Sequence, residues 1–377
     1  MSAPQQIQPR RILVRGTNWL GDAVMTTPAL MRLREKYPDA HIALLAPEKL
    51  ADLWANHPAV NETIPFAPGD SVFSVGKTLR AGNYDLALVF PNSPRSALEV
   101  WLAGIPQRIG HARPWRNFFL THAVPARAET VKMQKRSAGE IRQLVAADVS
   151  RRTGRNDRAF TSAATAHQMH EYLHLVAVLG ANPEPLTPQL FVTPGEIEAA
   201  NKKFDLSKIK RPLLGLNPGA EYGPAKRWPL EKFIAAASEI QKRTNCTWLV
   251  FGGQADVEIA NRIESAMASP PSAIWNLAGK TSLRELMTLL KICRVLLTND
   301  SGPMHVAAAL GPPVVVPFGS TSPELTGPGL PGDPRHRLLK SDAPCSPCFL
   351  RECPIDFRCL NGISAERVVE AVLQITR

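Results

Sequence analysis

Short apolar runs alternate with helix-like segments along this chain, and this alternation limits what the chain can fold into. Residues 11–15 (RILVR) predict a strand, residues 23–36 a helix, and residues 42–45 a second strand. A strand, a helix and a strand in this order are typical of a doubly wound α/β sheet, because parallel strands need a long crossover connection. Residues 85–90 predict a further strand. The first half of the chain is therefore expected to form a Rossmann-like domain.

A second set of such units follows a proline-rich linker. Residues 182–188 contain three prolines in seven positions, which a helix cannot accommodate. The later apolar runs that predict strands are residues 212–216, 247–251, 295–297 and 314–317. A chain of 377 residues is also too long for one compact core. We therefore expect two Rossmann-like domains, residues 1–185 and 186–362, facing each other across a cleft.

Two stretches of the second half place polar residues between an apolar run and a helix-like segment. Residues 217–229 form the first stretch. In the second, residues 295–297 predict a buried strand, Ser301 and Gly302 a turn, and Pro303 the first helical residue. The unpaired amides of that helix start face the region beyond the strand's carboxyl end, where open α/β sheets bind ligands. The arrangement predicts an anion-binding site.

The loop after the first strand, residues 16–22 (GTNWLGD), differs from the common nucleotide-binding fingerprints. It matches neither GxGxxG nor GxxxxGK[ST], which disfavours a Rossmann-type oxidoreductase and a P-loop enzyme. Its last residue, Asp22, stands at the start of the predicted helix. On the residues alone, Asp22 is either a carboxylate that the helix dipole stabilises or a functional carboxylate.

The positive charge is concentrated in one part of the chain. The formal net charge is +11, and between Arg95 and Arg158 there are 13 Lys and Arg against 5 Asp and Glu. Such a surplus predicts an anionic partner. No nucleic-acid-binding motif accompanies it, which disfavours nucleic acid as that partner. Charge that merely keeps the surface soluble is the remaining alternative.

The amino-terminal sequence does not resemble a secretory signal. Residues 1–9 are polar, and the apolar run at 11–15 is too short for a signal core. No apolar run approaches the roughly 18 residues that a membrane-spanning helix needs. We expect a cytoplasmic protein, with the membrane surface as a further place of contact.

Four cysteines form a C-x2-C-x4-C-x5-C cluster near the carboxyl end: Cys345, Cys348, Cys353 and Cys359. In a cytoplasmic protein such a cluster favours metal or redox chemistry over a disulfide framework. The spacing is not a standard zinc pattern. Structural zinc and free or disulfide-prone thiols therefore both remain open, whereas Cys246 and Cys293 are expected in the core.

Four segments together resemble the motifs of one family: GTNWLGD at 16–22, PNSPRSAL at 91–98, GPAKRWP at 223–229 and NDSGPMH at 299–305. The set is similar to the ADP-heptose:lipopolysaccharide heptosyltransferases of glycosyltransferase family 9, and most closely to their heptosyltransferase II branch. The likeness covers almost the whole chain, and GPAKRWP is its most specific part. It implies an α/β protein of the GT-B fold, with a terminal helix, residues 363–377, that packs back on the first domain.

The resemblance also implies an activity. Members of this branch transfer L-glycero-D-manno-heptose from ADP-heptose to the first heptose of the lipopolysaccharide inner core, with inversion. The family's proposed base is an aspartate at the position of Asp22, which would take the proton of the acceptor hydroxyl. Lys226 and the helix start at Ser301 would stabilise the departing diphosphate. No metal or cofactor is expected, because a lysine and a helix start can supply the positive charge.

The expected donor-binding residues follow strands of the second half: Asn217, Gly219, Glu221, Tyr222, Lys226, Gln254, Asp300, Ser301, Gly302, Met304 and His305. The expected acceptor-binding residues belong to the first half: Asn18, Asn92, Ser93, Arg95, Arg113 and Arg116. For Lys226 an ordinary surface lysine, and for His305 a structural histidine, are the alternatives.

The expected partners are ADP-L-glycero-D-manno-heptose and a heptosyl-Kdo2-lipid A acceptor, without nucleic acid. The expected location is the cytoplasm, with peripheral contact at the inner-membrane face. Heptosyltransferase I or III, acting on a different acceptor, is one alternative. A non-catalytic protein that binds anionic glycolipid or nucleic acid is the alternative from another class.

Overall fold

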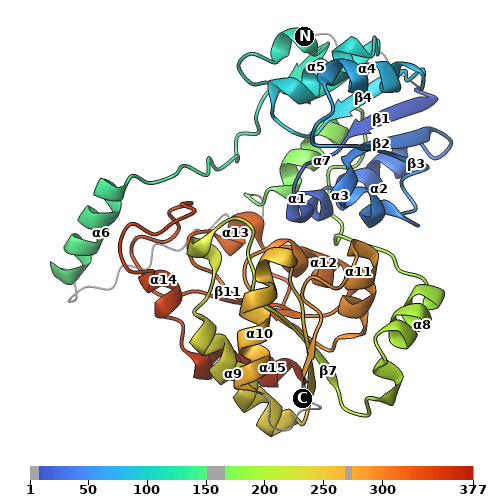
Figure 1. The fold of residues 1–377 in the computed structure, drawn as a ribbon. Helices are drawn as coiled ribbons and strands as arrows, with labels where there is room; N and C mark the ends of the chain where they lie inside the picture. The colour runs from blue at the N-terminus through green and yellow to red at the C-terminus, as the bar shows by residue number, and fades with distance from the viewer. Residues whose placement is uncertain (1–7, 151–165, 268–273, 377) are drawn as a thin grey trace. The chain divides into compact units, whose positions relative to one another are not determined.

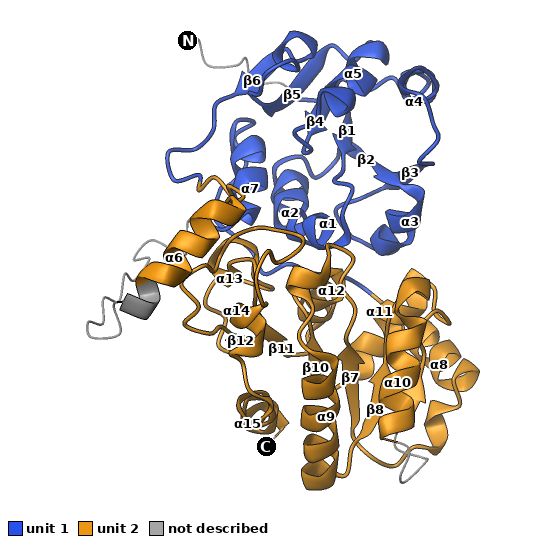
Figure 2. Ribbon diagram, turned by 60° about the vertical axis from the view of Figure 1, so that its left-hand side comes forward, with its two compact units in different colours: residues 1–130, 165–191 blue, residues 131–164, 192–377 orange. Residues whose placement is uncertain are grey.

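The computed structural model describes residues 8–150, 166–267 and 274–376. The chain divides into two compact units, of which unit 1 contains residues 1–130 and 165–191, and unit 2 contains residues 131–164 and 192–377 (Figure 2). Parts of the sequence discussed above lie outside the described ranges, namely residues 1–7, the end of the basic segment at residues 151–158, and residue 377.

Unit 1 is built on one parallel sheet with the strand order β3-β2-β1-β4-β5-β6 (Figure 2; the course of the chain is coloured in Figure 1). Its strands are β1 (Arg11–Arg15), β2 (His41–Pro47), β3 (Glu62–Phe66), β4 (Leu86–Val89), β5 (Gln107–His111) and β6 (His122–Val124). Its helices are α1 (Leu20–Met25), α2 (Thr27–Lys36), α3 (Glu48–Ala51), α4 (Val72–Arg80), α5 (Pro94–Leu102) and α7 (Met169–Ala177), with short 3-10 turns η1 (Asp52–Trp54) and η2 (Asn117–Phe119). This strand order is that of a Rossmann fold.

The helix predicted at residues 23–36 is two helices, α1 and α2. Pro28 lies in the first turn of α2 and has no backbone N–H to donate to the carbonyl oxygen of Val24. The Thr27 hydroxyl donates to that oxygen instead (2.8 Å). The proline therefore divides the predicted helix, and α1 becomes a short helix that carries Asp22 in its first turn.

Unit 2 repeats the same topology, with the strand order β12-β11-β10-β7-β8-β9 and all strands parallel. Its strands are β7 (Leu213–Asn217), β8 (Thr247–Val250), β9 (Ile274–Asn276), β10 (Leu296–Thr298), β11 (Val314–Pro317) and β12 (Arg337–Leu339). Its helices are α6 (Ala138–Ser150), α8 (Pro194–Lys203), α9 (Leu230–Thr244), α10 (Val257–Ala266), α11 (Leu283–Ile292), α12 (Gly302–Leu310), α13 (Pro323–Thr326), α14 (Arg358–Asn361) and α15 (Ala365–Thr376), with 3-10 turns η3 (Leu206–Lys208), η4 (Pro224–Lys226) and η5 (Gln254–Asp256).

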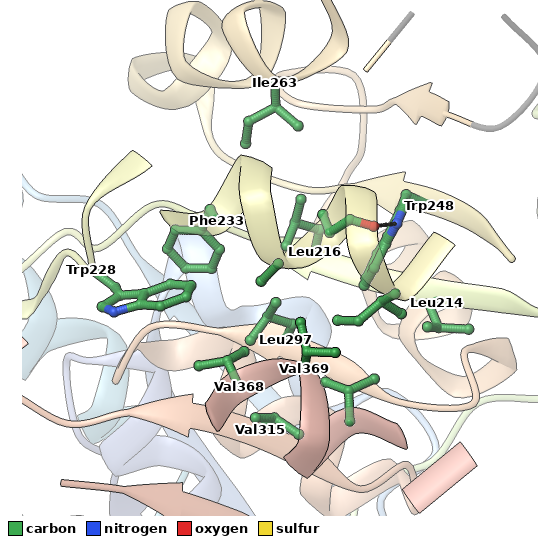
Figure 3. Packing of buried hydrophobic residues seen from close by; sticks show 14 of the residues in the cluster. Leu214, Leu216, Trp228, Phe233, Trp248, Ile263, Leu297, Val315, Val368 and Val369 are labelled. Atoms are coloured by element: carbon green, nitrogen blue, oxygen red, sulfur yellow. Dashed lines mark hydrogen bonds between the residues drawn. The ribbon is translucent and has the colours of Figure 1, made fainter. Parts of the chain in front are cut away.

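The core of unit 2 contains two tryptophans in contact with neighbouring helices. Trp228 packs edge-on against Phe233 of α9, with ring centroids 4.9 Å apart, and Trp248 donates from Nε1 to the Ala237 carbonyl oxygen (3.1 Å; Figure 3). Trp228 also donates from Nε1 to the Ile363 carbonyl oxygen (3.1 Å). Both indole N–H groups are therefore paired, as burial of a polar group requires.

The terminal helix differs from the expectation that it packs on the first domain. Val368, Val369, Val372 and Leu373 of α15 are buried in the core of unit 2. Figure 3 shows the first two of these valines. The helix contacts α9 and β11. Its apolar face is thus buried within unit 2.

The boundary between the units also differs from the expected one. The Gln189 amide donates to Thr27 Oγ1 (3.2 Å), and the Phe191 ring packs edge-on against His57, with centroids 5.6 Å apart. These contacts join the end of the predicted linker to unit 1, which extends to residue 191 rather than 185.

Residues 131–164 group with unit 2, although we expected them in the first domain. The Arg136 amide donates to the Cys348 carbonyl oxygen (3.1 Å), and Ile141 of α6 is buried against Cys345 and Cys348. Residues 345–359, which contain the four clustered cysteines and are called the cysteine segment below, therefore provide the surface on which α6 packs. None of the helices within the described ranges is long and apolar enough to cross a membrane.

Candidate active site

Lys226 forms the centre of the candidate site in unit 2. It lies in η4, in the loop after β7, and its ammonium group is 2.7 Å from Asp300 Oδ2. The same ammonium lies 4.8 Å from the centroid of the Tyr222 ring. Asp300 Oδ2 also accepts a hydrogen bond from the Thr321 hydroxyl. The ion pair is largely buried, with exposed side-chain fractions of 14% and 4%. Lys226 is therefore a positioned, charge-paired lysine rather than an ordinary surface lysine.

The loop that carries Lys226 is fixed by its backbone. Gly223 has φ 147°, and a Cβ atom at that position would lie 2.6 Å from the Arg351 carbonyl oxygen. The Ala225 amide donates to the same oxygen (3.0 Å). Only glycine fits this close approach. The position of Lys226 thus depends on a contact with a segment that is distant in the sequence.

Asn217 and Asn299 join the loops after β7 and β10. Asn217 donates from Nδ2 to Thr298 Oγ1 (3.2 Å) and Ser301 Oγ (3.4 Å). Asn299 accepts from the Trp228 amide at Oδ1 (2.9 Å) and donates from Nδ2 to the Pro218 carbonyl oxygen (2.6 Å). Because both side chains are buried, these bonds hold the two predicted motifs in one fixed arrangement.

The start of α12 provides the predicted amides. Ser301 is extended (φ −149°), and within the described residues its side chain makes no capping hydrogen bond to the helix. The first helical residue is Gly302, and Pro303 follows it. An uncapped helix start keeps its N–H groups and dipole available for an anion. Met304 has no exposed surface and His305 only 5%, so both contribute to the buried part of this helix start.

The remaining donor candidates lie near the ends of β7 and β8. A Cβ atom at Gly219 would lie 2.4 Å from Asp256 Oδ2, which also accepts from the Gly253 amide (3.0 Å). This contact brings the loop after β7 against η5, which begins at Gln254. Glu221 is exposed and Tyr222 is half-buried. The structure therefore brings the candidates together at the carboxyl edge of one sheet.

The cysteine segment contacts this site through hydrogen bonds and one cation–π contact. The Tyr222 hydroxyl donates to the Phe349 carbonyl oxygen (2.8 Å), and the Arg351 guanidinium lies 5.2 Å from the centre of the Tyr222 ring. The amides of Cys348 and Phe349 both donate to the Ser320 carbonyl oxygen (3.0 and 2.7 Å). The cysteine segment thus fixes both Tyr222 and Ser320, the residue before Thr321. The sequence predicted neither contact.

The cysteines themselves are free thiols. Burial raises the pKa of Cys345 and Cys348, and it raises the pKa of Cys359 to about 12. Within the described ranges, no three His, Cys, Asp or Glu side chains are arranged to hold a metal ion. Cys246 and Cys293 are buried in unit 2, as expected.

The candidate base lies in unit 1. Asp22 Oδ1 accepts a hydrogen bond from Gln168 Nε2 (2.7 Å), and the same Nε2 donates to the Tyr172 hydroxyl oxygen (3.0 Å). Tyr172 is buried, and desolvation, followed by the Asp22 charge, raises its pKa well above its ordinary value. Gln168 and Tyr172 were missed by sequence analysis, because no motif marks them and only the fold brings the start of α7 to Asp22.

The loop before Asp22 is anchored by a buried ion pair. Arg15 Nε lies 3.0 Å from Glu99 Oε2, and these side chains are 2% and 0% exposed. Arg15 also donates from Nη1 to the Gly16 carbonyl oxygen and to Asn18 Oδ1 (both 2.7 Å). Arg95 binds the other Glu99 oxygen (2.9 Å). Burial lowers the pKa of Arg15, and the Glu99 charge opposes that shift.

Other acceptor candidates have structural partners. The Ser93 hydroxyl caps α5 by accepting from the Ser96 amide. Arg116 is fully buried and donates from Nη1 to the Pro91 carbonyl oxygen (2.8 Å) and Asn92 Oδ1 (3.3 Å). Burial, and then the charge of Arg113, lowers the pKa of Arg116 to about 10. Within the described residues, Nε and Nη2 of Arg116 have no hydrogen-bond partner, and the contact of Arg116 with acceptor anions stays a prediction.

The comparisons with known proteins decide the family. The model of glycosyltransferase family 9 (heptosyltransferase) matches residues 72–138 and 151–357. The chain belongs to glycosyltransferase family 9. Lipopolysaccharide heptosyltransferase 2 of Escherichia coli (strain K12) is 35% identical over 333 residues, which cover 84% of this chain and 85% of that protein. Lipopolysaccharide heptosyltransferase 3 of the same organism is 28% identical over 316 residues, covering 80% of each.

A solved structure of this family has the same fold. The structure of the E. coli ADP-heptose lipopolysaccharide heptosyltransferase II matches with a TM-score of 0.75 and 30% identity, and covers 97% of this chain and 98% of that one. The predicted α/β class with two Rossmann-like domains, the GT-B fold of this glycosyltransferase family, is thereby confirmed.

Proposed function

We propose that the protein is an inverting heptosyltransferase that transfers L-glycero-D-manno-heptose from ADP-heptose to the first heptose of the lipopolysaccharide inner core. The proposal places it in the cytoplasm, at the face of the inner membrane, where a lipid-linked acceptor would be presented. The higher similarity to heptosyltransferase 2 than to heptosyltransferase 3 supports this acceptor over a different one. The single observation that carries the chemistry is the Lys226–Asp300 pair in the loops beside the start of α12.

The donor half of the mechanism uses unit 2. The diphosphate of ADP-heptose would bind at the amides of the α12 start, where a helix dipole favours negative charge. Lys226 would exchange part of its contact with Asp300 for a phosphate oxygen. As the bond between the heptose C1 and the diphosphate oxygen breaks, its electron pair stays on that oxygen. A lysine and backbone amides already in place stabilise this growing charge without reorganising.

The acceptor half uses Asp22 of unit 1. The attacking hydroxyl of the acceptor heptose forms the new bond to C1 on the face opposite the departing ADP, and Asp22 takes its proton. Gln168 holds the carboxylate through the 2.7 Å hydrogen bond, so that one oxygen has a fixed direction. A positioned base of this kind typically contributes about 10²–10⁴-fold in rate.

Release of ADP tests the proposal against its alternatives. The purified protein is mixed with ADP-heptose and, in separate reactions, with Kdo2-lipid A, heptosyl-Kdo2-lipid A or a longer core. The proposal expects rapid ADP release only with heptosyl-Kdo2-lipid A. Release with Kdo2-lipid A alone would indicate heptosyltransferase I, and release with the longer core heptosyltransferase III. Binding of glycolipid without any ADP release would indicate a non-catalytic binder.

A further inference from the structure

Unit 1 exposes three aromatic side chains on neighbouring elements. Trp115 is 89% exposed, Phe118 81% and Trp101 41%. The Phe119 ring connects two of them, since its centroid lies 5.7 Å from that of Trp101 and 5.6 Å from that of Phe118. We call Trp101, Trp115 and Phe118 the aromatic patch. Single exposed apolar residues are ordinary on a protein surface, but clustered large aromatics mark an interaction site.

The loop between β5 and β6 holds Trp115 in this exposed position. Trp115 has φ 64°, in the left-handed region that bulky residues rarely adopt. The Arg113 amide donates to Asn117 Oδ1 (2.9 Å), which closes the turn around Trp115. Arg108 donates from Nε to the Phe119 carbonyl oxygen (2.7 Å) and ties down the end of the loop. A strained backbone that presents a tryptophan to solvent indicates a functional constraint.

Three arginines belong to the elements next to the aromatic patch. Arg80 donates from Nη2 to the Leu102 carbonyl oxygen (2.7 Å), beside Trp101, and Arg108 and Arg113 belong to the loop just described. Within the described part of the chain, none of the three forms an ion pair with a carboxylate. The patch therefore combines aromatic rings with positive charge that the protein itself leaves unneutralised.

We propose that the aromatic patch docks unit 1 on the surface of an anionic lipid bilayer. The inference rests on the proposed function, which gives the enzyme an acceptor embedded in a membrane by its acyl chains. Tryptophan and phenylalanine insert at the boundary between headgroups and acyl chains, and nearby arginines are attracted by anionic headgroups. Charge complementarity favours this occupant over a second copy of the chain, whose patch would carry the same positive charge.

Vesicle co-sedimentation tests the docking without requiring activity. The purified protein is mixed with vesicles of phosphatidylcholine alone or with one quarter phosphatidylglycerol, and the bound fraction is measured. We expect binding to the anionic vesicles that weakens as salt is added. The double variant Trp115→Ser, Phe118→Ser should bind these vesicles at least about ten-fold more weakly, because two apolar rings are removed. Two control variants in unit 2, Leu144→Ser and Lys242→Gln, remove an exposed apolar group and a positive charge and should bind like wild type.

A second measurement separates membrane docking from acceptor recognition. The same double variant is assayed with heptosyl-Kdo2-lipid A in anionic vesicles and with the deacylated, water-soluble acceptor. Docking predicts a raised KM for the vesicle-bound acceptor and an unchanged KM for the soluble one. Equal changes with both acceptors would overturn the inference, since the rings would then contact the sugar. Vesicle binding that the substitutions do not change would also overturn the inference. So would analytical ultracentrifugation that finds a dimer of wild type and a monomer of the double variant, because the patch would then bind a second copy of the chain. If wild type binds vesicles but transfers no heptose, the proposed function fails while the docking surface stands.

Discussion

At the scale of single residues, the charge on Lys226 is balanced by Asp300 before any substrate arrives. Such a pair fixes the direction of the ammonium group in a largely buried site, where removing either partner leaves the other uncompensated. During transfer the leaving diphosphate gains charge, so the lysine interacts more strongly with the transition state than with the bound donor.

Replacing Lys226 by Ala should therefore weaken ADP binding and lower kcat together. Loss of a charge-stabilising group in a water-excluding site typically costs about 10²–10³-fold in rate. Lys202→Ala, on the exposed side of α8, is the matched control and should change neither quantity. Calorimetric titration of ADP into both variants measures the binding. Wild-type affinity in Lys226→Ala would remove the lysine from the donor site.

Gln168 is expected to position Asp22 rather than to react. Gln168→Leu removes the 2.7 Å hydrogen bond to the carboxylate and should lower kcat by about 10- to 100-fold, because the base loses its direction. It should also move the acidic limb of the kcat profile to higher pH, since a hydrogen bond to the charged carboxylate favours ionisation. Gln168→Asn, which can still donate, should restore part of the activity. An unshifted pH profile with full stability would contradict the positioning role.

Individual motif residues could be predicted because their types and order carry chemistry. GPAKRWP and NDSGPMH identified Lys226 and Asp300, and the fold brings them into contact. The partners that fix them, Thr321 and the Arg351 carbonyl, could not be predicted, because a hydroxyl and a backbone group leave no pattern in one sequence. Arg116 shows what a charge in the sequence does not reveal. Its positive charge suggested an anion contact, whereas its burial could be learned only from the structure.

At the scale of elements, a buried ion pair links β1 to α5 in unit 1. Arg15 at the end of β1 and Glu99 on α5 form an ion pair without solvent access. Arg15 in turn holds Asn18 in the loop that leads to Asp22. A helix, a strand and a site loop thus share one buried charge pair.

Glu99→Gln should destabilise the protein by roughly 3–5 kcal/mol, because Arg15 would remain buried without its counter-charge. Glu35→Gln is the control, since Glu35 forms an exposed pair with Arg32 (2.7 Å; Glu35 49% exposed), and exposed pairs contribute at most about 1 kcal/mol. Urea unfolding of both variants measures the difference. Equal, small changes in the free energy of unfolding of the two variants would show that the buried Arg15–Glu99 pair contributes no more than the exposed pair.

The strands were predictable from sequence, whereas the ends of the helices were less so. An apolar run of β-branched residues and leucine specifies a buried parallel strand almost alone, and β1 was predicted with its observed bounds. The helix at 23–36 was wrongly predicted as continuous, because Pro28 cannot donate a hydrogen bond to the Val24 carbonyl oxygen. The backbone N–H group that Pro28 lacks thus accounts for the boundary between α1 and α2.

At the scale of the whole molecule, stability should depend on pH through three buried histidines. Desolvation lowers the pKa of His57, His111 and His336 to about 4 from an ordinary value of 6.5. Between these values the unfolded chain binds protons that the folded protein excludes, so acid favours unfolding. The stability present above pH 6.5 is therefore lost as the pH falls from 6.5 to 4, by up to roughly 3 kcal/mol per histidine.

Chemical unfolding at a series of pH values measures this effect. The free energy of unfolding should fall steadily from pH 6.5 to 4, and His57→Gln should make that decline shallower. A free energy that does not change over this range would show that the histidines titrate normally in the folded protein.

The terminal helix marks the limit of prediction at this scale. Its apolar positions predicted a buried face, and α15 has one. The partner of that face was inferred from the family, and it proved to be unit 2 itself. Amphipathic spacing specifies that a face is covered, but it does not identify the covering surface.

The central claim is that this chain adds one heptose to heptosyl-Kdo2-lipid A with Asp22 as the base. Mass spectrometry of the acceptor after incubation with ADP-heptose tests it most directly, with wild type and Asp22→Asn side by side. The account predicts an acceptor heavier by one heptose with wild type, and a rate about 10²–10⁴-fold lower with Asp22→Asn, although that variant still binds ADP-heptose. An unchanged acceptor mass with wild type, or near-normal transfer by Asp22→Asn, would contradict it.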